Sequence, residues 1–499
     1  MFNRKLIAGA VAAAFLLPIA SSAAELDAET RLKQLELMVQ QMQQQRAEQD
    51  KQIELLTKEL VGIENQVSQS KIVKGEEKGK SQGSPVYGAF KDGLVFDDGT
   101  GNWKLQINGR IQMDYKDYSP DEWKGDTFSI RRARFGGTFS FLKNFAVRVE
   151  GEYANDATGA RGTTALTYGY LDYTHWQGAK VRIGQFKPFF GLERPQSTNF
   201  TDFTELSLAT NNGAIFTSTY DRGIMLFGDP LTWVNYNAYV VNGTGQNNDD
   251  LRDSKDIGGR INANFASLAD IKNAVIHVGA SASDGSIGFS TSAGNSLAQS
   301  TESNGNQFFN IANISSTTVG TTTTSSRFTS DRSRLGLETA LTYGPLKFQA
   351  EYIRANFEGK RAPGVVTTSF DNDIKAWYAD FNWMVTGESY ADTYKSGVFG
   401  RMKPKNNFNA DNNWGAFELG LRYSKFDASD FKAILPAPTA STAFTSEADS
   451  WTGGAKWILN PNARILLNYI YTRFDTPVRI LSKTSDDEKS IVVRAQYDF

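Results

Sequence analysis

The chain has 499 residues, of which 12% are aromatic and 22% charged, and its formal net charge is -2. It has no cysteine, which excludes disulfides, thiolate metal sites and cysteine nucleophiles. A charge this close to zero indicates no nucleic-acid partner. The only two histidines, His175 and His277, are far apart in the sequence, so we interpret both as ordinary strand residues and predict no metal site or cofactor.

The first 24 residues have the layout of a secretory signal peptide. Arg4 and Lys5 precede an apolar run from Leu6 to Ala20, and small residues follow up to Ala24, after which we place the cleavage site. No later stretch contains the ~18 consecutive apolar residues that a membrane helix requires. We therefore predict an exported chain without a helical anchor.

Residues 25–67 repeat every seven positions. Nine of eleven seam positions are apolar; the seam comprises Leu32, Leu35, Val39, Met42, Arg46, Gln49, Ile53, Leu56, Leu60, Ile63 and Val67. Such a seam predicts a periplasmic coiled coil that needs partner helices and is compatible with three of them. The alternative is a helix folded back on its own chain. Residues 68–100, rich at first in Lys, Gly, Glu and Ser, are predicted to be a linker.

From Trp103 onward the apolar period changes to two. Residues 103–116 alternate without a break, which exceeds a typical soluble strand of ~5 to 6 residues and suits a tilted membrane strand of ~9 to 11. Similar alternation recurs through the chain, for example in 257–265, 417–424 and 464–472. We predict that residues 101–499 form an all-β transmembrane antiparallel β-barrel. At ~25 residues per strand it would have ~16 strands, with 14 or 18 as alternatives.

The last ten residues indicate the compartment. Ile491, Val493, Ala495 and Tyr497 share one face with the terminal Phe499, whereas Arg494 lies on the opposite, mostly polar face. In an outer-membrane barrel the apolar face meets lipid and the polar face lines the lumen. This pattern predicts the bacterial outer membrane as the location.

Two connections are too long for simple turns. Residues 283–330 are rich in Ser, Thr, Asn and Gly, which predicts an extracellular loop. Residues 188–220 are richer in apolar side chains, which include Phe189, Phe190, Leu192, Phe200, Phe203 and Phe216. We expect this second segment to fold into the lumen and narrow the pore.

Basic residues recur on the lumen-facing side of the predicted strands: Lys104, Arg110, Arg132, Arg134, Arg148, Lys180, Arg182, Arg260, Arg334, Arg422, Arg464 and Arg494. Arg131 would face lipid unless it lies at the rim or a bulge shifts the register. Because guanidinium groups donate paired hydrogen bonds to oxyanions, we predict an anion-favouring pore.

Carboxylates share these lumen faces: Asp114, Glu150, Glu152, Glu338, Glu351, Glu418 and Asp498. The arginines could therefore serve in ion pairs that only fill space, and the pore could be nonselective. No recognisable arrangement of a nucleophile with an acid or base is present in the sequence, so we do not predict an enzyme.

The chain resembles the phosphate- and polyphosphate-selective porin family over about residues 100 to 499. The likeness is carried by FSIRRARFGGT (128–138), KVRIGQFKPFFGLER (180–194), AEYI (350–353), TGE (386–388), WGAFEL (414–419) and the last strand. The resemblance implies a trimer of 16-stranded barrels, each with an inward-folded third loop. It also implies an arginine ladder that leads to a phosphate site of lysines and an aspartate.

Carried onto this chain, the paired arginines of the family match Arg131 and Arg132, and Arg194 replaces a lysine. The other site positions fall near Ala146, Thr167 and Glu358, and a last lysine falls near Asp373 or Lys375. These departures put strict phosphate specificity in doubt.

We therefore predict a homotrimeric outer-membrane porin for small anions, with phosphate or polyphosphate as the leading solute. The alternatives are a weakly selective pore, a pore for uncharged solutes such as sugars, and a structural barrel whose coiled coil binds peptidoglycan or a periplasmic partner.

Overall fold

The computed structural model describes residues 86–90, 93–121, 123–154, 164–212, 215–216, 220–248, 254–290, 296–312, 314–315, 327–361 and 368–499. The chain divides into two units, Met1–Gly83 and Ser84–Phe499. The predicted signal peptide and coiled coil belong to the first unit and lie outside the described residues. Within the described ranges, no helix has the length and apolar character needed to cross a bilayer.

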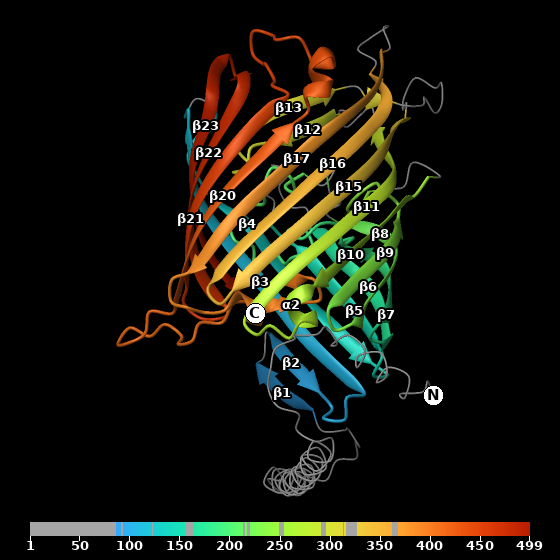
Figure 1. The fold of residues 1–499 in the computed structure, drawn as a ribbon, viewed down its shortest axis with the longest axis vertical. Coiled ribbons are helices and arrows are strands. Elements are labelled where there is room, and N and C mark those ends of the chain that lie inside the picture. The colour runs from blue at the N-terminus through green and yellow to red at the C-terminus, as the bar shows by residue number, and fades with distance from the viewer. Residues whose placement is uncertain are drawn as a thin grey trace, which may run out of the picture. The chain divides into compact units, whose positions relative to one another are not determined.

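The second unit is a closed antiparallel barrel (Figure 1). Its sheet contains 19 strands in the described residues, and without the short additions β1, β2 and β14 the ring has 16. Each strand of the ring pairs with the next, and β23 pairs with β3 to close it. The predicted barrel of about 16 strands is confirmed. The ring consists of β3 (Trp103–Ser119), β4 (Thr127–Phe141), β5 (Phe145–Glu152), β6 (Ala165–Trp176), β7 (Ala179–Phe186), β8 (Asp221–Leu231), β9 (Val234–Val241), β10 (Asp256–Asn264), β11 (Ala274–Ser290), β15 (Arg327–Tyr343), β16 (Leu346–Arg361), β17 (Thr368–Met384), β20 (Ala416–Asp427), β21 (Glu447–Ile458), β22 (Ala463–Ile480) and β23 (Lys483–Asp498).

The two faces of the ring follow the alternation of the sequence. On β3, Ile111 and Met113 are exposed on the outside, whereas Gln112 and Asp114 are buried on the lumen side. Side chains alternate across a pleated strand, so the apolar set of each strand faces outward together. Polar side chains of the lumen face are buried because loops fill much of the interior.

A small hairpin pairs with the start of β3. It consists of β1 (Tyr87–Phe90) and β2 (Leu94–Asp97), and β2 pairs with residues 104–107 of β3. Because β23 pairs with β3 only from residue 110 onward, β2 covers an edge that would otherwise be open. The predicted linker over 68–100 therefore differs from the structure in its last part, which is a hairpin.

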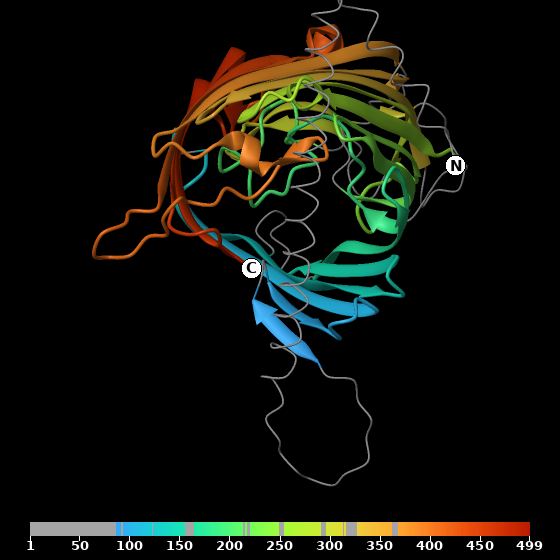
Figure 2. The same cartoon turned by 60° about the horizontal axis from the view of Figure 1, so that its bottom comes forward.

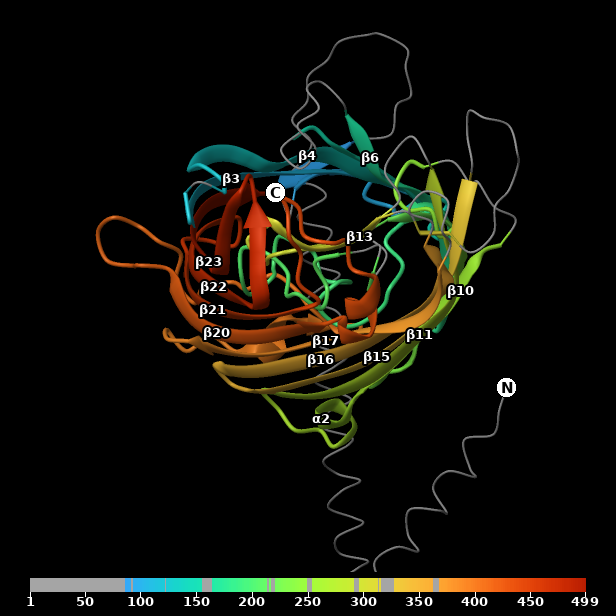
Figure 3. The ribbon, with the colours of Figure 1, turned by 90° about the horizontal axis from the view of Figure 1, so that it is seen from above.

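The serine- and threonine-rich region 283–330 is not the plain extracellular loop that its composition predicts. The strand β11 continues to Ser290, β15 begins at Arg327, and between them lie β12 (Ser296–Ser300), β13 (Gln307–Ala312) and β14 (Ile314–Ser315). Leu297, Phe308 and Phe309 of the β12–β13 hairpin are fully buried. Viewed from above, the end of the barrel that carries the long connections, the hairpin lies within the ring (Figure 3).

The described residues between β7 and β8, which are 187–212, 215–216 and 220, also fold into the ring, as predicted (Figure 3). We call this segment the lumen loop. Phe190 and Phe216 of the lumen loop, together with Phe308 and Phe309, belong to an apolar cluster that includes inward side chains of β16, β17, β20, β21 and β22, such as Phe357. Burying this apolar surface stabilises the loops against that wall. Space for solute is therefore left mainly beside β3–β6, whose residues line a cavity.

At the other end, the connection between β17 and β20 also enters the barrel (Figure 2). It contains η2 (Tyr390–Thr393), β18 (Tyr394–Lys395) and β19 (Val398–Phe399). Arg260 Nη2 donates to the carbonyl of Gly397 at 2.8 Å, and His277 Nδ1 lies 2.6 Å from the Tyr394 hydroxyl. We call residues 394–399 the lower hairpin. Two further short helices, α2 (Phe265–Leu268) and η3 (Ser429–Ile434), lie in other connections.

Candidate functional site: the arginine-lined passage

A bulge in β4 determines where Arg131 points. Arg132 pairs with Gln112 of β3, but the next pair is Ile130 with Met113, so Arg131 is the extra residue. A bulge leaves one residue outside the ladder and changes the direction of its side chain. As a result Arg131 reaches the lumen loop, where its Nε lies 2.7 Å from Oε1 of Glu205. Of the two alternatives for Arg131, the structure shows the bulge.

Glu205 of the lumen loop collects three of the predicted arginines. Its carboxylate oxygens lie 2.7 Å from Arg131, 2.9 Å from Arg494 and 3.9 Å from Arg132. Burial alone would raise the pKa of Glu205, but the surrounding cations, Arg131 first, hold that pKa well below its usual range. Arg494 also makes a bidentate pair with Asp114, at 2.7 and 2.8 Å. These arginines therefore anchor the lumen loop to the wall.

Four other predicted site residues also form ion pairs with carboxylates of the protein. Arg182 forms a bidentate pair with Asp172, Arg260 lies 2.7 Å from Glu338, and Arg464 lies 3.3 Å from Asp498. Arg422 lies 2.8 Å from Glu302, which precedes β13, and 3.2 Å from Glu193 of the lumen loop. The first three pairs join strands of the wall, whereas the pairs of Arg422 hold two loops, and the charges of all four arginines are compensated locally.

Arg194 lies in the lumen loop and is buried. Its Nη1 donates to the carbonyl of Thr210 at 3.0 Å. Burial lowers the pKa of Arg194 to about 10. The position that replaces a family lysine therefore helps to hold the fold of the loop.

The remaining predicted arginines, Arg110, Arg134 and Arg148, line one cavity of about 260 Å³. Among its described lining residues are five cationic side chains, the other two being Lys187 and Arg401, and a single carboxylate side chain, Glu150. Tyr168, Tyr220, Thr198 and Phe200 complete much of the wall. The cavity lies between β3–β6 and the lumen loop, on the side away from the apolar cluster.

Glu150 is shared by the three arginines of the cavity. Its carboxylate lies 2.8 Å from Arg148, 3.6 Å from Arg134 and 3.8 Å from Arg110. Arg134 has a second partner in Glu152, whose Oε2 lies 2.6 Å from its Nε, so two carboxylates face three guanidinium groups and a positive excess remains. In addition, Arg148 Nε makes no hydrogen bond to any atom that the structure describes. This geometry can bind an anion through several N–H donors at once.

Lys187 and Arg401 also line the cavity, and the sequence analysis missed both. Lys187 is the first residue of the lumen loop, and its Nζ donates to the carbonyls of Arg194 and Gln196 at 3.0 and 3.1 Å. Arg401 follows the lower hairpin and lies 2.6 Å from Asp498. Both residues are in connections rather than strands, so strand parity could not identify them.

The family-derived positions divide into two groups. Thr167 is near the cavity, since its hydroxyl donates to the backbone carbonyl of Glu150 at 2.9 Å. Glu358, Asp373 and Lys375 instead project from the outer face of β16 and β17 and do not line the passage. Ala146, on β5, has no ionisable side chain. The lysine and aspartate positions implied by the resemblance are thus not brought together here.

Comparisons with known proteins identify the family of the chain. The model of the family described as phosphate-selective porin O and P matches residues 105–499. Porin O of Pseudomonas aeruginosa is 25% identical over 448 residues, which cover 84% of this chain and 94% of that protein.

Among solved structures, OmpT of Vibrio cholerae is 12% identical with a TM-score of 0.46. The outer membrane channel DcaP of Acinetobacter baumannii is 10% identical with a TM-score of 0.47. Each comparison covers 80% of this chain and 98% of the other. The family match extends over almost the whole barrel, and the chain belongs to the phosphate-selective porin O and P family and is an outer-membrane porin.

Proposed function

We propose that the porin conducts small anions, phosphate or polyphosphate first among them, by passive diffusion with transient binding in the arginine-lined cavity. The observation that carries this proposal is the excess of cationic side chains over carboxylates among the residues lining the cavity. The family match supports phosphate as the leading solute.

The mechanism follows from the donors in the cavity. An entering oxyanion exchanges part of its hydration shell for N–H groups of Arg110, Arg134 and Arg148. Glu150 weakens anion binding at this site, because its negative charge lies within 4 Å of all three guanidinium groups. Weak binding is needed for conduction, since an anion that is held too tightly does not leave.

The test is the triple substitution Arg110→Gln, Arg134→Gln and Arg148→Gln in planar bilayers. Reversal potentials in a potassium chloride gradient measure the ratio of anion to cation permeability, and added phosphate measures block of the chloride current. The triple variant should lose most of its anion preference and its phosphate block. The matched control, Arg473→Gln, removes an arginine from the outer face and should change neither. Cation preference in the unsubstituted porin, or a triple variant that behaves like it, contradicts the proposal.

A weakly selective porin is the second candidate. The local pairing of Arg182, Arg260 and Arg494 with carboxylates favours it, because those arginines add little net potential along the passage. A chloride current that phosphate does not block, with anion preference retained, would favour this second candidate over phosphate selectivity.

For the assembly, we propose a homotrimer braced by a coiled coil over residues 25–67, with residues 68 to about 85 as a linker. The heptad seam supports this arrangement. Binding of the coiled coil to peptidoglycan or a periplasmic partner is a related proposal. Deletion of Leu32 to Val67 should destabilise the trimer while leaving the selectivity of each pore unchanged. A loss of selectivity in the deletion variant would indicate that the segment acts in the pore.

A further inference from the structure

Lys187 is the only lysine among the described residues that line the arginine-lined cavity. It directly follows β7, and only 5% of the residue is exposed. Lysine is almost never fully buried unless its ammonium is paired. In the described part of the chain, however, Lys187 forms no ion pair with a carboxylate. The protonation state of this buried amine therefore depends on its other neighbours.

Two backbone carbonyls hold the amine in place. Its Nζ donates to the carbonyls of Arg194 and Gln196 at 3.0 and 3.1 Å, and both belong to the lumen loop. A neutral amine has two hydrogens and one lone pair, whereas an ammonium has three hydrogens and no lone pair. The two carbonyls therefore satisfy the neutral form completely and leave its lone pair unused. An ammonium at the same position would have a third N–H for which the described residues provide no acceptor.

The charges around Lys187 also favour the neutral amine. Burial, followed by repulsion from four arginines, holds the pKa of Lys187 well below its usual range. The four are Arg194, Arg134, Arg110 and Arg132. The ring of Tyr220, whose centroid lies 6.0 Å from Nζ, favours the ammonium only weakly at that distance. A desolvated lysine beside other cations is an activated nucleophile, and the arginines keep their own charges when it is neutral.

We propose that Lys187 is a covalent modification site for small aldehydes that carry a phosphate group. Arg110, Arg134 and Arg148 line the same cavity and can bind the phosphate while the aldehyde carbon lies beside the amine. The cavity of about 260 Å³ is several-fold larger than the ~30 Å³ that one water occupies in the liquid, so a phosphate and a short carbon chain fit together. This inference rests on the proposed anion site, because the same guanidinium groups hold the phosphate.

The reaction is an imine condensation. The lone pair of Nζ attacks the aldehyde carbon, and the resulting carbinolamine loses water. A C=N bond replaces the C=O bond, the carbonyl oxygen leaves with the two amine hydrogens as water, and no oxidant or reductant is consumed. Because Nζ then no longer donates to the carbonyls of Arg194 and Gln196, two hydrogen bonds are lost. Contacts between the phosphate and the arginines offset this loss, so an aldehyde without an anionic group should not accumulate on Lys187.

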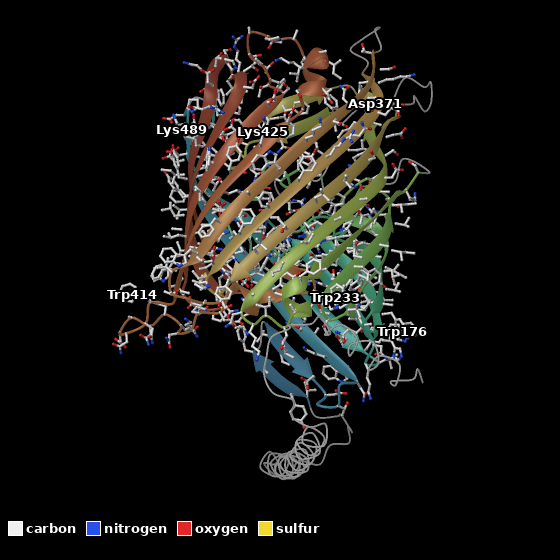
Figure 4. The ribbon with its side chains drawn as sticks, viewed as in Figure 1. Trp176, Trp233, Asp371, Trp414, Lys425 and Lys489 are labelled. Carbon is white, nitrogen blue, oxygen red and sulfur yellow. The ribbon has the colours of Figure 1, made fainter. Side chains whose placement is uncertain are left out.

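The test traps the imine. The full-length porin in detergent is incubated with glycolaldehyde phosphate, borohydride reduces the imine to a stable secondary amine, and peptide mass spectrometry measures the labelling of each lysine. Lys425 and Lys489 are internal references, since 40% and 45% of their side chains are exposed and both lie in the upper part of the barrel (Figure 4). Lys187 should be labelled at least about tenfold faster at pH 7, where fewer than ~1 in 1,000 exposed lysine amines are neutral.

Two further measurements show whether the label lies in the passage. Excess inorganic phosphate should protect Lys187 and leave the labelling of Lys425 and Lys489 unchanged. In planar bilayers, trapping should permanently lower the current of the unsubstituted porin but not that of Lys187→Arg, which has no reactive amine. The matched control, Lys425→Arg, should lose current as the unsubstituted porin does.

The pH dependence distinguishes an activated amine from one that is only accessible. Labelling of the two reference lysines should rise about tenfold per pH unit up to ~10.4, because only their neutral forms react. Labelling of Lys187 should level off at a lower pH. A profile parallel to that of the references, or labelling no faster than theirs, overturns the proposal.

Failure of this proposal and failure of the anion site give different results. If phosphate blocks the chloride current while Lys187 is not labelled preferentially, the modification site is wrong and the anion site stands. If phosphate does not block and glycolaldehyde labels Lys187 as fast as its phosphate does, the anion site is wrong, and the assignment of phosphate-bearing aldehydes is overturned with it.

Discussion

Arg131 Nε lies 2.7 Å from Oε1 of Glu205, so a bulge in the wall and the loop that crosses the lumen meet in one buried ion pair. The pair joins residues 74 positions apart in the chain. Arg131 can make this contact only because the bulge turns its side chain inward. The position of the lumen loop therefore depends on an irregularity of β4.

Glu205→Gln should loosen the lumen loop. The substitution leaves Arg131, Arg132 and Arg494 without the carboxylate they share, and breaking a buried charge pair typically costs about 3 to 5 kcal/mol. We expect a lower denaturant midpoint and larger fluctuations of single-channel current. Arg473→Gln breaks an exposed pair on the outer face and should cost less than about 1 kcal/mol. Equal effects of the two substitutions would show that Glu205 does not anchor the loop.

Glu150→Gln should increase anion preference. It removes the carboxylate side chain that lines the cavity and leaves Arg110 and Arg148 without their carboxylate partner, whereas Arg134 keeps its pair with Glu152. A change of ~1 kcal/mol in anion binding corresponds to a roughly fivefold change in the binding constant. Reversal potentials measure the preference, and phosphate block should become tighter by a similar factor. Reduced anion preference would contradict the role assigned to the cavity.

Anion preference should decrease as pH rises. Burial, followed by repulsion from Arg194 and Arg134, holds the pKa of Lys187 well below its usual range. The ammonium is charged below that pKa and becomes neutral above it, so the cavity loses a charge before exposed lysines titrate near ~10.4. Between the lowered pKa of Lys187 in the folded protein and ~10.4, the unfolded chain keeps its proton. The free energy of unfolding therefore rises with pH over this range.

Lys187→Gln isolates this titration, because it removes the charge at every pH. The variant should have a low, pH-independent anion preference over the window in which the unsubstituted porin changes. Lys187→Arg should keep the charge and also give a flat profile, but at high preference. Parallel pH profiles for all three proteins would exclude Lys187 as the titrating group.

Removal of the lower hairpin should increase conductance. Gly400 N donates to the carbonyl of Thr393 at 2.8 Å, so these two ends are adjacent and two glycines can replace residues 394–399. The deletion frees the space between Arg260, His277 and Asp229, all of which the hairpin contacts. Single-channel conductance should rise clearly, whereas Tyr394→Phe, which removes only the bond to His277, should change it little. Unchanged conductance after deletion would place the limiting constriction elsewhere.

Phe308→Ala should weaken the packing of the β12–β13 hairpin. Phe308 is fully buried and contacts the rings of Phe426 and Phe474 at 5.4 and 5.8 Å. Truncating a buried phenylalanine typically costs about 3 to 5 kcal/mol. Denaturant unfolding should show this loss, whereas Phe128→Ala on the outer face should not unfold the barrel more easily in detergent. Equal stability of Phe308→Ala and the unsubstituted porin would mean that the hairpin is not part of the core.

The ring of strands could be predicted because each strand contains its own alternation of apolar and polar residues. The alternation of Ile111, Gln112, Met113 and Asp114 is local, and both faces of the barrel follow from it. The hairpin β12–β13 was not predictable in this way. Leu297, Phe308 and Phe309 are few among many serines and threonines, and their burial depends on a wall formed more than 100 positions later by residues such as Phe426 and Phe474.

The candidate site was predictable only in part, for a similar reason. Strand parity placed Arg110, Arg134 and Arg148 on the lumen side, but it could not show which arginines would find a carboxylate partner. The partners of Arg422 and Arg494, for example, include Glu193, Glu302 and Glu205 from distant loops. Which charges remain uncompensated is therefore a property of the folded loops.

The division of the lumen into an apolar side and a charged side has a consequence for how such channels diversify. Substitutions among Phe357, Phe426 and their neighbours alter a packed core, so most would reduce stability and be lost. The residues around Glu150 face a cavity, and changes there can alter the transported solute while the packed side keeps the loops in place. A barrel built in this way can acquire a new solute preference through a few substitutions on one wall.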